Sequence, residues 1–593
     1  MHSYIRPHEY VALRLPSDVT KVIQLTPNTN ISLGKYGTFP ANQIIGRPFY
    51  LTFEIQDEPD DDGYVLRVVS AAELHAEALI TEGSGEADGE GEDLEPSISD
   101  GGVNARNNRE TVDDGSAQKL TLSEIEALKK QATGAGREII AKLLESHSAL
   151  DQKTAFSLAK YTLRKRKKFL KRFTVLPMDV GLLTEWMLEE KDAGRIMELR
   201  DELIGLIGCW GNVHHGGNPS LDETIPVKPN GRYLIVDETG GLVVAAMAER
   251  MGILHPHHDD EDQDGEPEQP SNEPSQEQSG EPNTNNAPGT QQEEKLPIRK
   301  RRRPQPMSAS GTTLTLLHAH TQPNLSLLKY FGFDVSNPDE THPLHTHLKT
   351  LSWLQLVDPA ADPLYANEPE TVPDEVLATW KPNKRSLYYR KKNRFARVRS
   401  VVDETRAGGF DGLIVASLME PASVLKHLVP LLAGSAPVVV YSPTIEPLVE
   451  LVDLYSTARR TAYINLKREL EERKQQQQNQ PSPSSSTSPS TPLPSHDQDQ
   501  DPDLNADFPL DPTLLLAPSL QTARVRPYQV LPGRTHPLMS GRGGAEGYIF
   551  HAVRVIPSSE RIEARGTASR KKRRVGGTEV STPAGTGTGT SAS

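Results

Sequence analysis

Closely spaced cations are the residues of this chain whose types and spacing most clearly could do chemistry, because together they could hold nucleic-acid phosphates. The densest group lies in the segment KTAFSLAKYTLRKRKKFLKRF, residues 153–173. Its cations are Lys160, Arg164, Lys165, Arg166, Lys167, Lys168, Lys171 and Arg172. Such a cluster gains free energy by releasing counterions from an RNA backbone, so we predict an RNA-binding surface there. A solvated helix face or a localisation signal would use the same residues.

A second basic segment, KRSLYYRKKNRFARVRS at residues 384–400, mixes cations with aromatic residues. The cations could bind phosphates while Tyr388, Tyr389 and Phe395 stack on bases. A basic amphipathic helix whose aromatic side chains face the core would have the same pattern. The sequence leaves both interpretations open.

A short glycine turn follows the apolar run RYLIVDE, residues 232–238. Ligands of α/β folds bind at the carboxyl ends of the strands, so this turn is where a nucleotide-like cofactor would lie. Cofactor loops usually contain several spaced glycines, whereas here Thr239 is followed only by Gly240 and Gly241. We therefore predict a tight turn that binds no cofactor. Asp237 and Glu238 could hold a ribose hydroxyl, but they equally suit the start of a helix.

Other kinds of catalytic or metal site receive no support from the sequence. The histidines have no cysteine partners at zinc-ligand spacing, and neither a G-x-S-x-G elbow nor a phosphate-binding P-loop occurs. We predict no metal site and no catalytic residue. The single Cys209 excludes an internal disulfide, fits a reducing compartment and is expected in the core. No apolar run has the length of a signal peptide or membrane span, so a soluble, non-secreted protein is expected.

The length of 593 residues predicts two or three folded units, and 47 prolines with only 35% hydrophobic residues indicate long disordered stretches. Short strands separated by Pro, Asn and Gly predict a β-barrel-like domain over residues 1–80. Residues 81–119 form a predicted acidic linker. A basic helical connector is predicted over 120–175, where Thr121 and Glu124 have capping-box spacing.

The rest of the chain predicts a parallel sheet covered by helices on both faces. Apolar strands alternate with amphipathic helices over residues 176–254 and 307–474. Low-complexity stretches at 255–306 and 475–507 are predicted disordered insertions. Residues 508–560 are expected to complete the α/β domain, and 561–593 form a predicted basic, disordered tail. The fold class is therefore α+β with several domains.

Several blocks of this sequence resemble one known family. They are LRLPSDVTKVIQLTPNTNISLGKYGTFPANQIIGRPFYLTFEI, LTLSEIEALKKQATGAGREIIAKLLESHSALDQKTAFSLAKYTLRKRKKF, GRYLIVDETGGLVVAAMAERMG and PGRTHPLMSGRGG. With them the chain is similar to the non-catalytic, RNA-binding subunit of the eukaryotic tRNA (adenine(58)-N(1))-methyltransferase. The most specific pieces are SLGKYGTF, IIGRPFYLTFEI and the DETGGL turn. The resemblance spans the parts predicted to be ordered.

The resemblance implies an N-terminal barrel-like domain, a helical connector and a Rossmann-like methyltransferase domain with a degenerate cofactor site. It implies a heterotetramer of two such chains with two catalytic subunits that bind S-adenosylmethionine, and no membrane partner. The basic segment from Lys160 to Arg172 would contact tRNA, and no catalytic residue is carried over. Clusters at 299–303 and 570–574 further suggest a nuclear protein.

Two other functions remain open from the sequence. The chain could be a self-sufficient RNA methyltransferase that uses the turn at 237–241, although the missing glycine-rich loop counts against it. It could also be an RNA scaffold or translation-initiation factor with no link to methylation.

Overall fold

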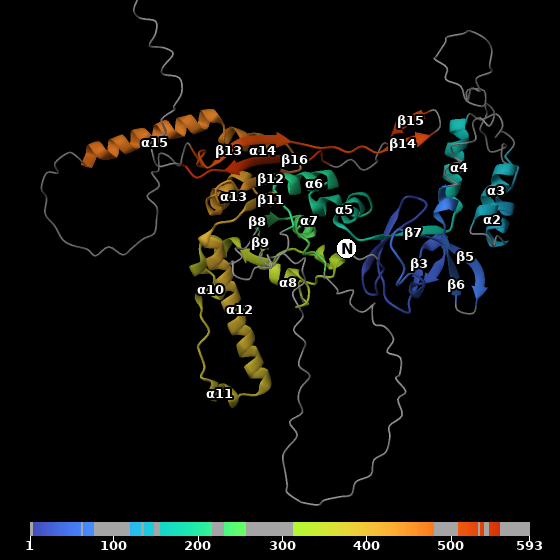
Figure 1. Cartoon of the computed structure of the whole chain (residues 1–593), viewed down its shortest axis with the longest axis horizontal. Coiled ribbons are helices and arrows are strands. Elements are labelled where there is room, and N and C mark those ends of the chain that lie inside the picture. Colours follow the sequence, from blue (N-terminus) through green and yellow to red (C-terminus); the bar gives the residue numbers. More distant parts are fainter. Residues whose placement is uncertain are drawn as a thin grey trace, which may run out of the picture.

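The computed structural model describes residues 4–60, 63–75, 119–131, 136–147, 155–215, 231–255, 312–337, 339–478, 508–531, 534–538 and 545–557 (Figure 1). The predicted acidic linker, both predicted insertions and the predicted tail lie almost entirely outside these residues. At the edge of the second insertion, helix α15 continues to Gln478.

The N-terminal part of the chain forms an antiparallel five-stranded sheet with the order β2-β1-β7-β5-β6. Its strands are β1 (Tyr10–Arg14), β2 (Thr20–Gln24), β5 (Thr52–Asp60), β6 (Gly63–Val69) and β7 (Arg172–Pro177). Strands β3 (Asn30–Ser32) and β4 (Thr38–Pro40) form a separate pair. A closed barrel is not confirmed, since within the described residues the edge strands β2 and β6 do not pair with each other.

Strand β7 connects the beginning of the chain with residues far along it. Residues 172–177, predicted to end the helical connector and begin the α/β domain, lie in the centre of the N-terminal sheet between β1 and β5. Phe173 points into the core, where its ring stacks on Phe39 at 4.5 Å and on Phe53 at 5.6 Å between centroids. The sheet therefore needs a strand from beyond the helical segment to complete its core.

The helical connector consists of α2 (Leu122–Gln131), α3 (Arg137–Glu145) and α4 (Ala155–Phe169). The predicted capping box is confirmed: the amide of Thr121 donates to the Glu124 carboxylate at 2.8 Å, and the Glu124 amide donates to the Thr121 hydroxyl at 3.3 Å. The amide and the hydroxyl of Thr121 both donate to the Glu124 carboxylate, and these hydrogen bonds hold the pKa of Glu124 below its ordinary value. Ile139, Ile140 and Leu143 pack with Phe169 and Leu170 in a small core of their own.

The α/β domain contains a seven-stranded sheet with the order β10-β9-β8-β11-β12-β16-β13. The strands are β8 (Arg232–Asp237), β9 (Thr313–His318), β10 (Leu348–Ser352), β11 (Gly412–Ala416), β12 (Pro437–Ser442), β13 (Leu515–Gln521) and β16 (Tyr548–Arg554). The first five are mutually parallel, and β16 runs antiparallel between β12 and β13. Numbered along the chain, the parallel strands follow the doubly wound order 3-2-1-4-5.

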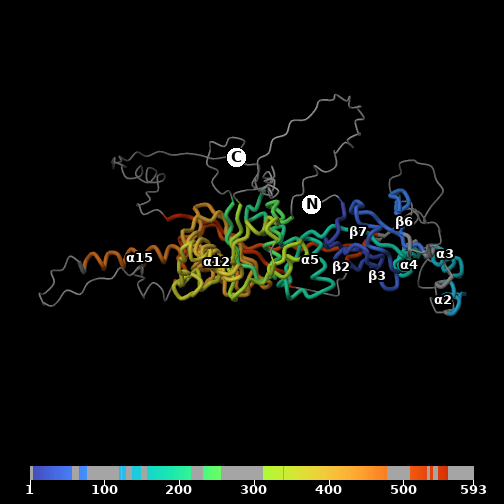
Figure 2. Tube along the Cα trace, turned by 90° about the horizontal axis from the view of Figure 1, so that it is seen from below, coloured from blue at the N-terminus to red at the C-terminus, as the bar shows by residue number. Residues whose placement is uncertain are grey.

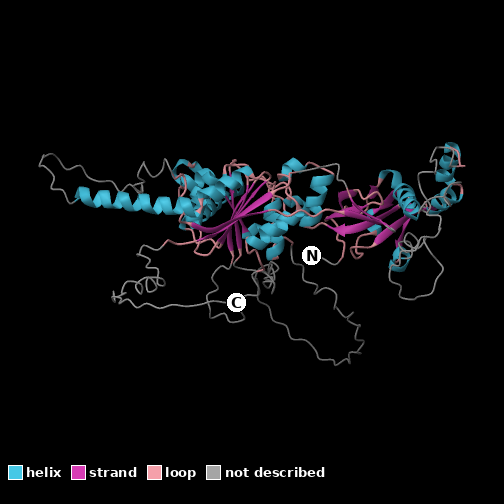
Figure 3. Ribbon diagram, turned by 90° about the horizontal axis from the view of Figure 1, so that it is seen from above, coloured by secondary structure: helices cyan, strands magenta, loops and turns pink. Residues whose placement is uncertain are grey.

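Helices cover both faces of this sheet (Figures 2 and 3). Successive residues of β8 enter opposite cores: Tyr233 and Ile235 pack on one side, Leu234 and Val236 on the other. The first core also contains residues of α5 (Val180–Glu189), α6 (Asp201–Trp210) and α7 (Leu242–Met251). The second contains residues of α12 (Pro382–Ala407), α13 (Pro421–Leu428) and α14 (Glu446–Leu454). The predicted α/β architecture is confirmed.

The remaining elements are short helices, one long helix and a small hairpin. They are η1 (Gly34–Tyr36), η2 (Ala41–Gln43), η4 (Ala193–Ile196), η6 (Leu328–Phe331), α8 (Leu344–His347), α9 (Trp353–Val357), η7 (Pro359–Ala361), α10 (Pro363–Ala366), α11 (Asp374–Ala378), η8 (Val429–Leu431), α15 (Thr457–Gln478), β14 (Tyr528–Leu531) and β15 (Arg534–Pro537). The β14–β15 hairpin lies against α4, far from the sheet strands that flank it in sequence (Figure 1).

The prediction that Cys209 is a core residue is wrong, because its side chain is exposed. On α6 the buried positions are Leu203, Ile204, Ile207 and Gly208. Cys209 follows them by one residue, and the 100° turn per residue takes it away from the core face.

Candidate cofactor turn and candidate nucleic-acid interface

The glycine turn after β8 is built around the buried carboxylate of Asp237. Its Oδ1 accepts hydrogen bonds from the Thr239 amide at 2.7 Å and the Thr239 hydroxyl at 2.5 Å, and its Oδ2 accepts one from the Val244 amide at 3.0 Å. The Val243 amide donates to the Thr239 hydroxyl oxygen at 3.2 Å. Two amides at the start of α7 are thus satisfied from within the turn.

The electrostatics of the turn follow from this burial. Burial raises the pKa of Asp237, and the hydrogen bonds from Thr239 and Val244 act in the opposite direction. The carboxylate lies at the positive end of α7, where the helix dipole favours a negative charge. Glu238, which is exposed, accepts a hydrogen bond from the Leu418 amide at 2.8 Å. Both carboxylates considered for a ribose hydroxyl therefore accept backbone amides instead.

The residues that face the turn come from the segment after β9. Gly240 and Gly241 have φ of 76° and 93°, which glycine adopts without strain. A Cβ added to Gly241 would lie 3.1 Å from Cδ2 and 3.2 Å from Cα of Leu325. The amide of Leu327 donates to the Gly240 carbonyl at 3.1 Å, and both leucines are buried. Aliphatic side chains therefore cover the glycines where a cofactor loop would present its backbone to a ligand.

Sequence reasoning located this turn but missed the leucines that cover it. In the structure the block NLSLLKYF forms the short η6 and contributes its leucines to the buried core. The spacing of Leu325, Leu327 and Leu328 indicates that they are buried. No local pattern indicates that they pack against the glycine turn.

The cations predicted to bind RNA lie mainly on α4. Positions 160, 164, 167 and 168 share one helix face, because residues three, four, seven and eight apart lie on the same side. Arg164 and Lys168 are exposed there. Lys167 forms an ion pair with Asp18, and its carbonyl accepts a hydrogen bond from the Tyr36 hydroxyl at 3.1 Å.

The other predicted cations have different surroundings. Lys165 lies over the Tyr161 ring at 4.8 Å from its centroid, and burial lowers the pKa of this lysine. Lys171 follows α4 and is half-buried. Arg172 lies in β7, with 8% of its side chain exposed and its guanidinium 3.5 Å from the Glu54 carboxylate. The structure thus brings the residues from Lys160 to Lys168 together on one helix and places Arg172 in the central strand β7 of the N-terminal sheet.

A buried carboxylate that sequence reasoning missed connects the N-terminal sheet with the helical connector. Glu54 on β5, 4% exposed, contacts the guanidinium groups of Arg67, Arg137 and Arg172. Glu73 joins the cluster, and its hydrogen bond with Arg67 lowers its pKa to about 2. Arg137 begins α3, and α3 packs on α4, so the cluster attaches both helices to the sheet.

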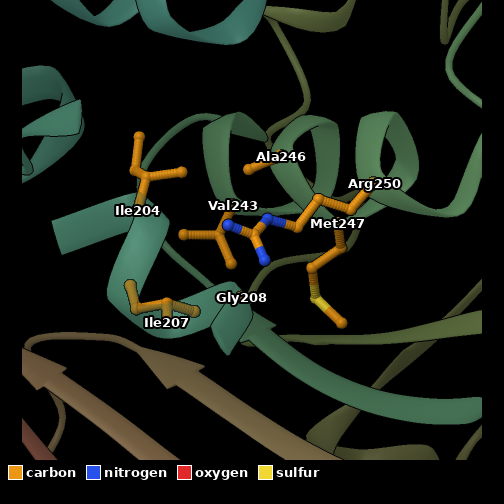
Figure 4. Close-up of a pocket in the computed structure, with 7 residues that line it drawn as sticks. All are labelled: Ile204, Ile207, Gly208, Val243, Ala246, Met247 and Arg250. Carbon is orange, nitrogen blue, oxygen red and sulfur yellow. The ribbon is translucent and has the colours of Figure 1, made fainter. Parts of the chain in front are cut away.

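The described residues enclose a small cavity and line a larger cleft. A cavity of about 10 Å³ lies between α6 and α7 under the Arg250 guanidinium, lined by aliphatic side chains such as Ile207 and Met247 (Figure 4). It has room for one water at most. A cleft of about 500 Å³ lies where Tyr10 and Phe49 of the N-terminal part meet Tyr330 of the α/β domain. It contains Glu9, whose pKa is raised by burial.

Within the described residues, no three His, Cys, Asp or Glu side chains gather closely enough to hold a metal ion. The same residues include no helix with the length and apolar character needed to cross a membrane.

Known proteins resemble this chain over nearly its whole length. It is 63% identical over 591 residues to a protein of Aspergillus fumigatus, covering 99% of each chain, and that protein is named tRNA (adenine(58)-N(1))-methyltransferase non-catalytic subunit trm6. A protein of Schizosaccharomyces pombe with the same name is 28% identical, with 96% of each chain covered.

A solved structure of a SAM-dependent O-methyltransferase from Thermotoga maritima is similar with a TM-score of 0.36 and 8% identity, covering 94% of this chain and 97% of that one. The doubly wound fold is supported by the strand order of the sheet. The model of the Gcd10p family matches residues 4–381, which is well over half of the sequence. The chain therefore belongs to the Gcd10p family.

Proposed function

We propose that this chain is the non-catalytic subunit of the methyltransferase that forms N1-methyladenosine at position 58 of the tRNA T-loop, and that it binds tRNA. The observation that carries the proposal is the 63% identity, over 99% of both chains, to a relative named as that subunit. The cations on α4 support tRNA binding, because Arg164 and Lys168 are exposed on one face.

Binding of S-adenosylmethionine and methyl transfer belong in this proposal to a separate catalytic subunit, in a complex of two plus two chains. The buried glycine turn after β8 supports the assignment of cofactor binding to the other subunit. The amides at the start of α7 donate within the turn, and Leu325 packs over Gly241. Few groups at the carboxyl ends of β8 and β9 are left to recognise a nucleotide.

Methyl transfer tests the proposal directly. Labelled S-adenosylmethionine and unmodified tRNA are incubated with this chain alone, with the catalytic subunit alone, and with the two co-expressed. We expect methylation at position 58 only in the co-expressed sample, because one chain supplies the cofactor site and the other part of the tRNA site.

Methylation by this chain alone would contradict the proposal and support a self-sufficient methyltransferase. Failure of the two chains to co-purify would favour an RNA scaffold or initiation factor instead. The control is tRNA with guanine at position 58, which should remain unmethylated in every sample.

We infer that the complex is nuclear. This inference rests on the pair of basic clusters at 299–303 and 570–574, which lie outside the described residues. Replacing the Lys and Arg of both clusters by Gln is expected to move a fluorescently tagged chain to the cytoplasm. An unchanged nuclear signal in that variant would contradict the role of these clusters.

A further inference from the structure

Helix α12 carries the strongest concentration of positive charge on a described helix that the proposed function has not used. Over Pro382–Ala407 it has nine Lys and Arg against two carboxylates, Asp403 and Glu404. The whole chain has a net charge of -15, so this charge is local. The helix lies between β10 and β11 in the sequence and projects from the α/β domain (Figure 1).

The fully buried residues of α12 lie at its C-terminal end. They are Val401, Val402 and Thr405. Near this buried end the charge of Arg399 is compensated. Its guanidinium lies 3.5 Å from the Glu368 carboxylate and 3.9 Å from that of Asp403. The C-terminal end therefore attaches α12 to the domain, and nearby carboxylates neutralise its positive charge.

The projecting part presents exposed cations on more than one face. Arg390, Arg394 and Arg397 are exposed and share a face, since they are spaced by four and three residues. A second face carries Arg385 and Lys392 on either side of Tyr389, whose side chain is 42% exposed. These two faces are called the arginine face and the tyrosine face below.

The aromatic residues of α12 divide between two roles. Tyr388 is half-buried: its hydroxyl oxygen accepts a hydrogen bond from the Val372 amide at 3.1 Å, and its ring contacts Trp380 edge to face. Within the part of the chain that the structure describes, Tyr389 has no such anchor beyond its contact with the Tyr388 ring. The amphipathic interpretation of this segment therefore fits Tyr388 and does not fit Tyr389, which lies among cations on the surface.

We propose that the projecting part of α12 is a second tRNA-binding surface, in which the arginine face binds backbone phosphates and Tyr389 stacks on an unpaired base. This inference rests on the proposed function, which makes tRNA the ligand. Guanidinium groups bind phosphate oxygens in bidentate geometry, and an exposed aromatic ring between cations suits a base of single-stranded RNA.

Nucleic acid fits this surface better than an acidic protein. A protein partner would need an apolar strip to pack against, and along the projecting helix only Leu387 is a strongly exposed aliphatic side chain, at 69%. Cations on several faces suit a flexible polyanion that can contact more than one side of the helix.

This surface is separate from the cations of α4. In Figure 1 α4 lies beside the N-terminal sheet, whereas α12 projects from the α/β domain well away from it. Substitutions at sites so far apart are expected to have additive effects. Loss of the α12 contacts should therefore weaken tRNA binding without removing the contribution of α4.

The test uses the complete complex with its catalytic subunit and measures the Kd for unmodified tRNA over a series of salt concentrations. The triple variant R390Q/R394Q/R397Q should raise Kd about 10- to 100-fold and lower the magnitude of the salt slope by about two to three. The matched control is K467Q/R468Q/R473Q on α15, whose exposed cations alternate with Glu469, Glu471 and Glu472. It removes the same charge and should change Kd less than about twofold.

Tyr389 has its own pair of variants. Tyr389→Ala should raise Kd about tenfold, whereas Tyr389→Phe should bind like the unaltered complex, because stacking needs the ring and not the hydroxyl. Circular dichroism checks that each variant keeps its helical content.

Several outcomes would overturn the inference. If the α12 triple variant keeps its Kd and salt slope while R164Q/K168Q on α4 weakens binding, the inference fails and the proposed function stands. If the unaltered complex does not bind tRNA, the proposed function fails as well. If the α12 variant loses its catalytic subunit and, as an isolated chain, binds tRNA normally, α12 is a protein-binding surface.

Discussion

Replacing Glu54 by alanine is expected to lower the free energy of unfolding of the N-terminal sheet by about 3–5 kcal/mol. The carboxylate is buried on β5, and the guanidinium groups of Arg67, Arg137 and Arg172 surround it. Arg172 is the critical partner, because its own side chain is only 8% exposed. Without Glu54 its charge would lack that buried carboxylate, and desolvation of such a charge is costly.

Hydrogen exchange followed by mass spectrometry measures this effect where it arises, since a chain of several domains does not unfold in one step. Peptides from β5 and β7 should exchange much faster in Glu54→Ala, and peptides from β8 and β11 should not change. The control is Glu185→Ala, which breaks an exposed ion pair with Arg14 at 3.4 Å and should cost less than about 1 kcal/mol. Equal exchange in the two variants would show that Glu54 is not a stabilising centre.

The same variant has a consequence for RNA binding. Arg137 begins α3, and α3 packs on α4 through a core that includes Leu143 and Phe169. Glu54 therefore helps to hold the basic helix against the sheet. Weaker attachment of α3 should loosen the orientation of the α4 cations as well as the sheet itself.

Much of the α/β domain can be predicted from the sequence because its central strands are buried on both faces. Strands such as β8, β11 and β12 appear as uninterrupted apolar runs, which are typical of parallel sheets between layers of helices. Strand β10, with the sequence LKTLS, lies at the sheet edge and includes polar positions. Because polar residues separate its leucines, β10 cannot be distinguished by composition from the irregular segments nearby.

The N-terminal sheet could not be predicted completely because one of its central strands is supplied by distant residues. The sequence RFTVLP of β7 follows a run of cations, and nothing local indicates that it pairs with β1 and β5. Arg172 shows the effect on the site prediction. Its place in the basic run suggested a surface residue, and its pairing with Glu54 across the sheet buries it.

The position of the candidate cofactor turn was predicted, and its interior was not. Two glycines after an apolar strand indicate a strand-to-helix turn in any α/β fold. The sequence allowed Asp237 to serve the start of a helix, and the hydrogen bond from the Val244 amide of α7 confirms that alternative, although the burial of the carboxylate was not predicted. The cover over Gly241 by Leu325 is a contact between residues more than eighty positions apart, which no local spacing encodes.

Asp237→Ala is the variant with the largest effect expected in the α/β domain, a loss of about 3–5 kcal/mol from the free energy of unfolding. Removing the carboxylate leaves the Thr239 amide, the Thr239 hydroxyl and the Val244 amide without their acceptor in a buried turn. An unsatisfied buried donor costs about 1–3 kcal/mol. Faster hydrogen exchange in peptides from β8 and α7, with β5 and β7 unchanged, would measure the loss.

Asp237→Asn separates a structural role from a cofactor role. The amide retains one acceptor oxygen for the turn, so we expect a smaller loss of stability than in Asp237→Ala, again followed by exchange in β8 and α7. The Kd of the whole complex for S-adenosylmethionine should not change at a temperature where the variant remains folded. A weaker affinity for S-adenosylmethionine with unchanged exchange in β8 and α7 would instead mean that Asp237 contacts the cofactor. In that case the hydrogen bonds that Asp237 accepts from Thr239 and Val244 would have to break when S-adenosylmethionine binds.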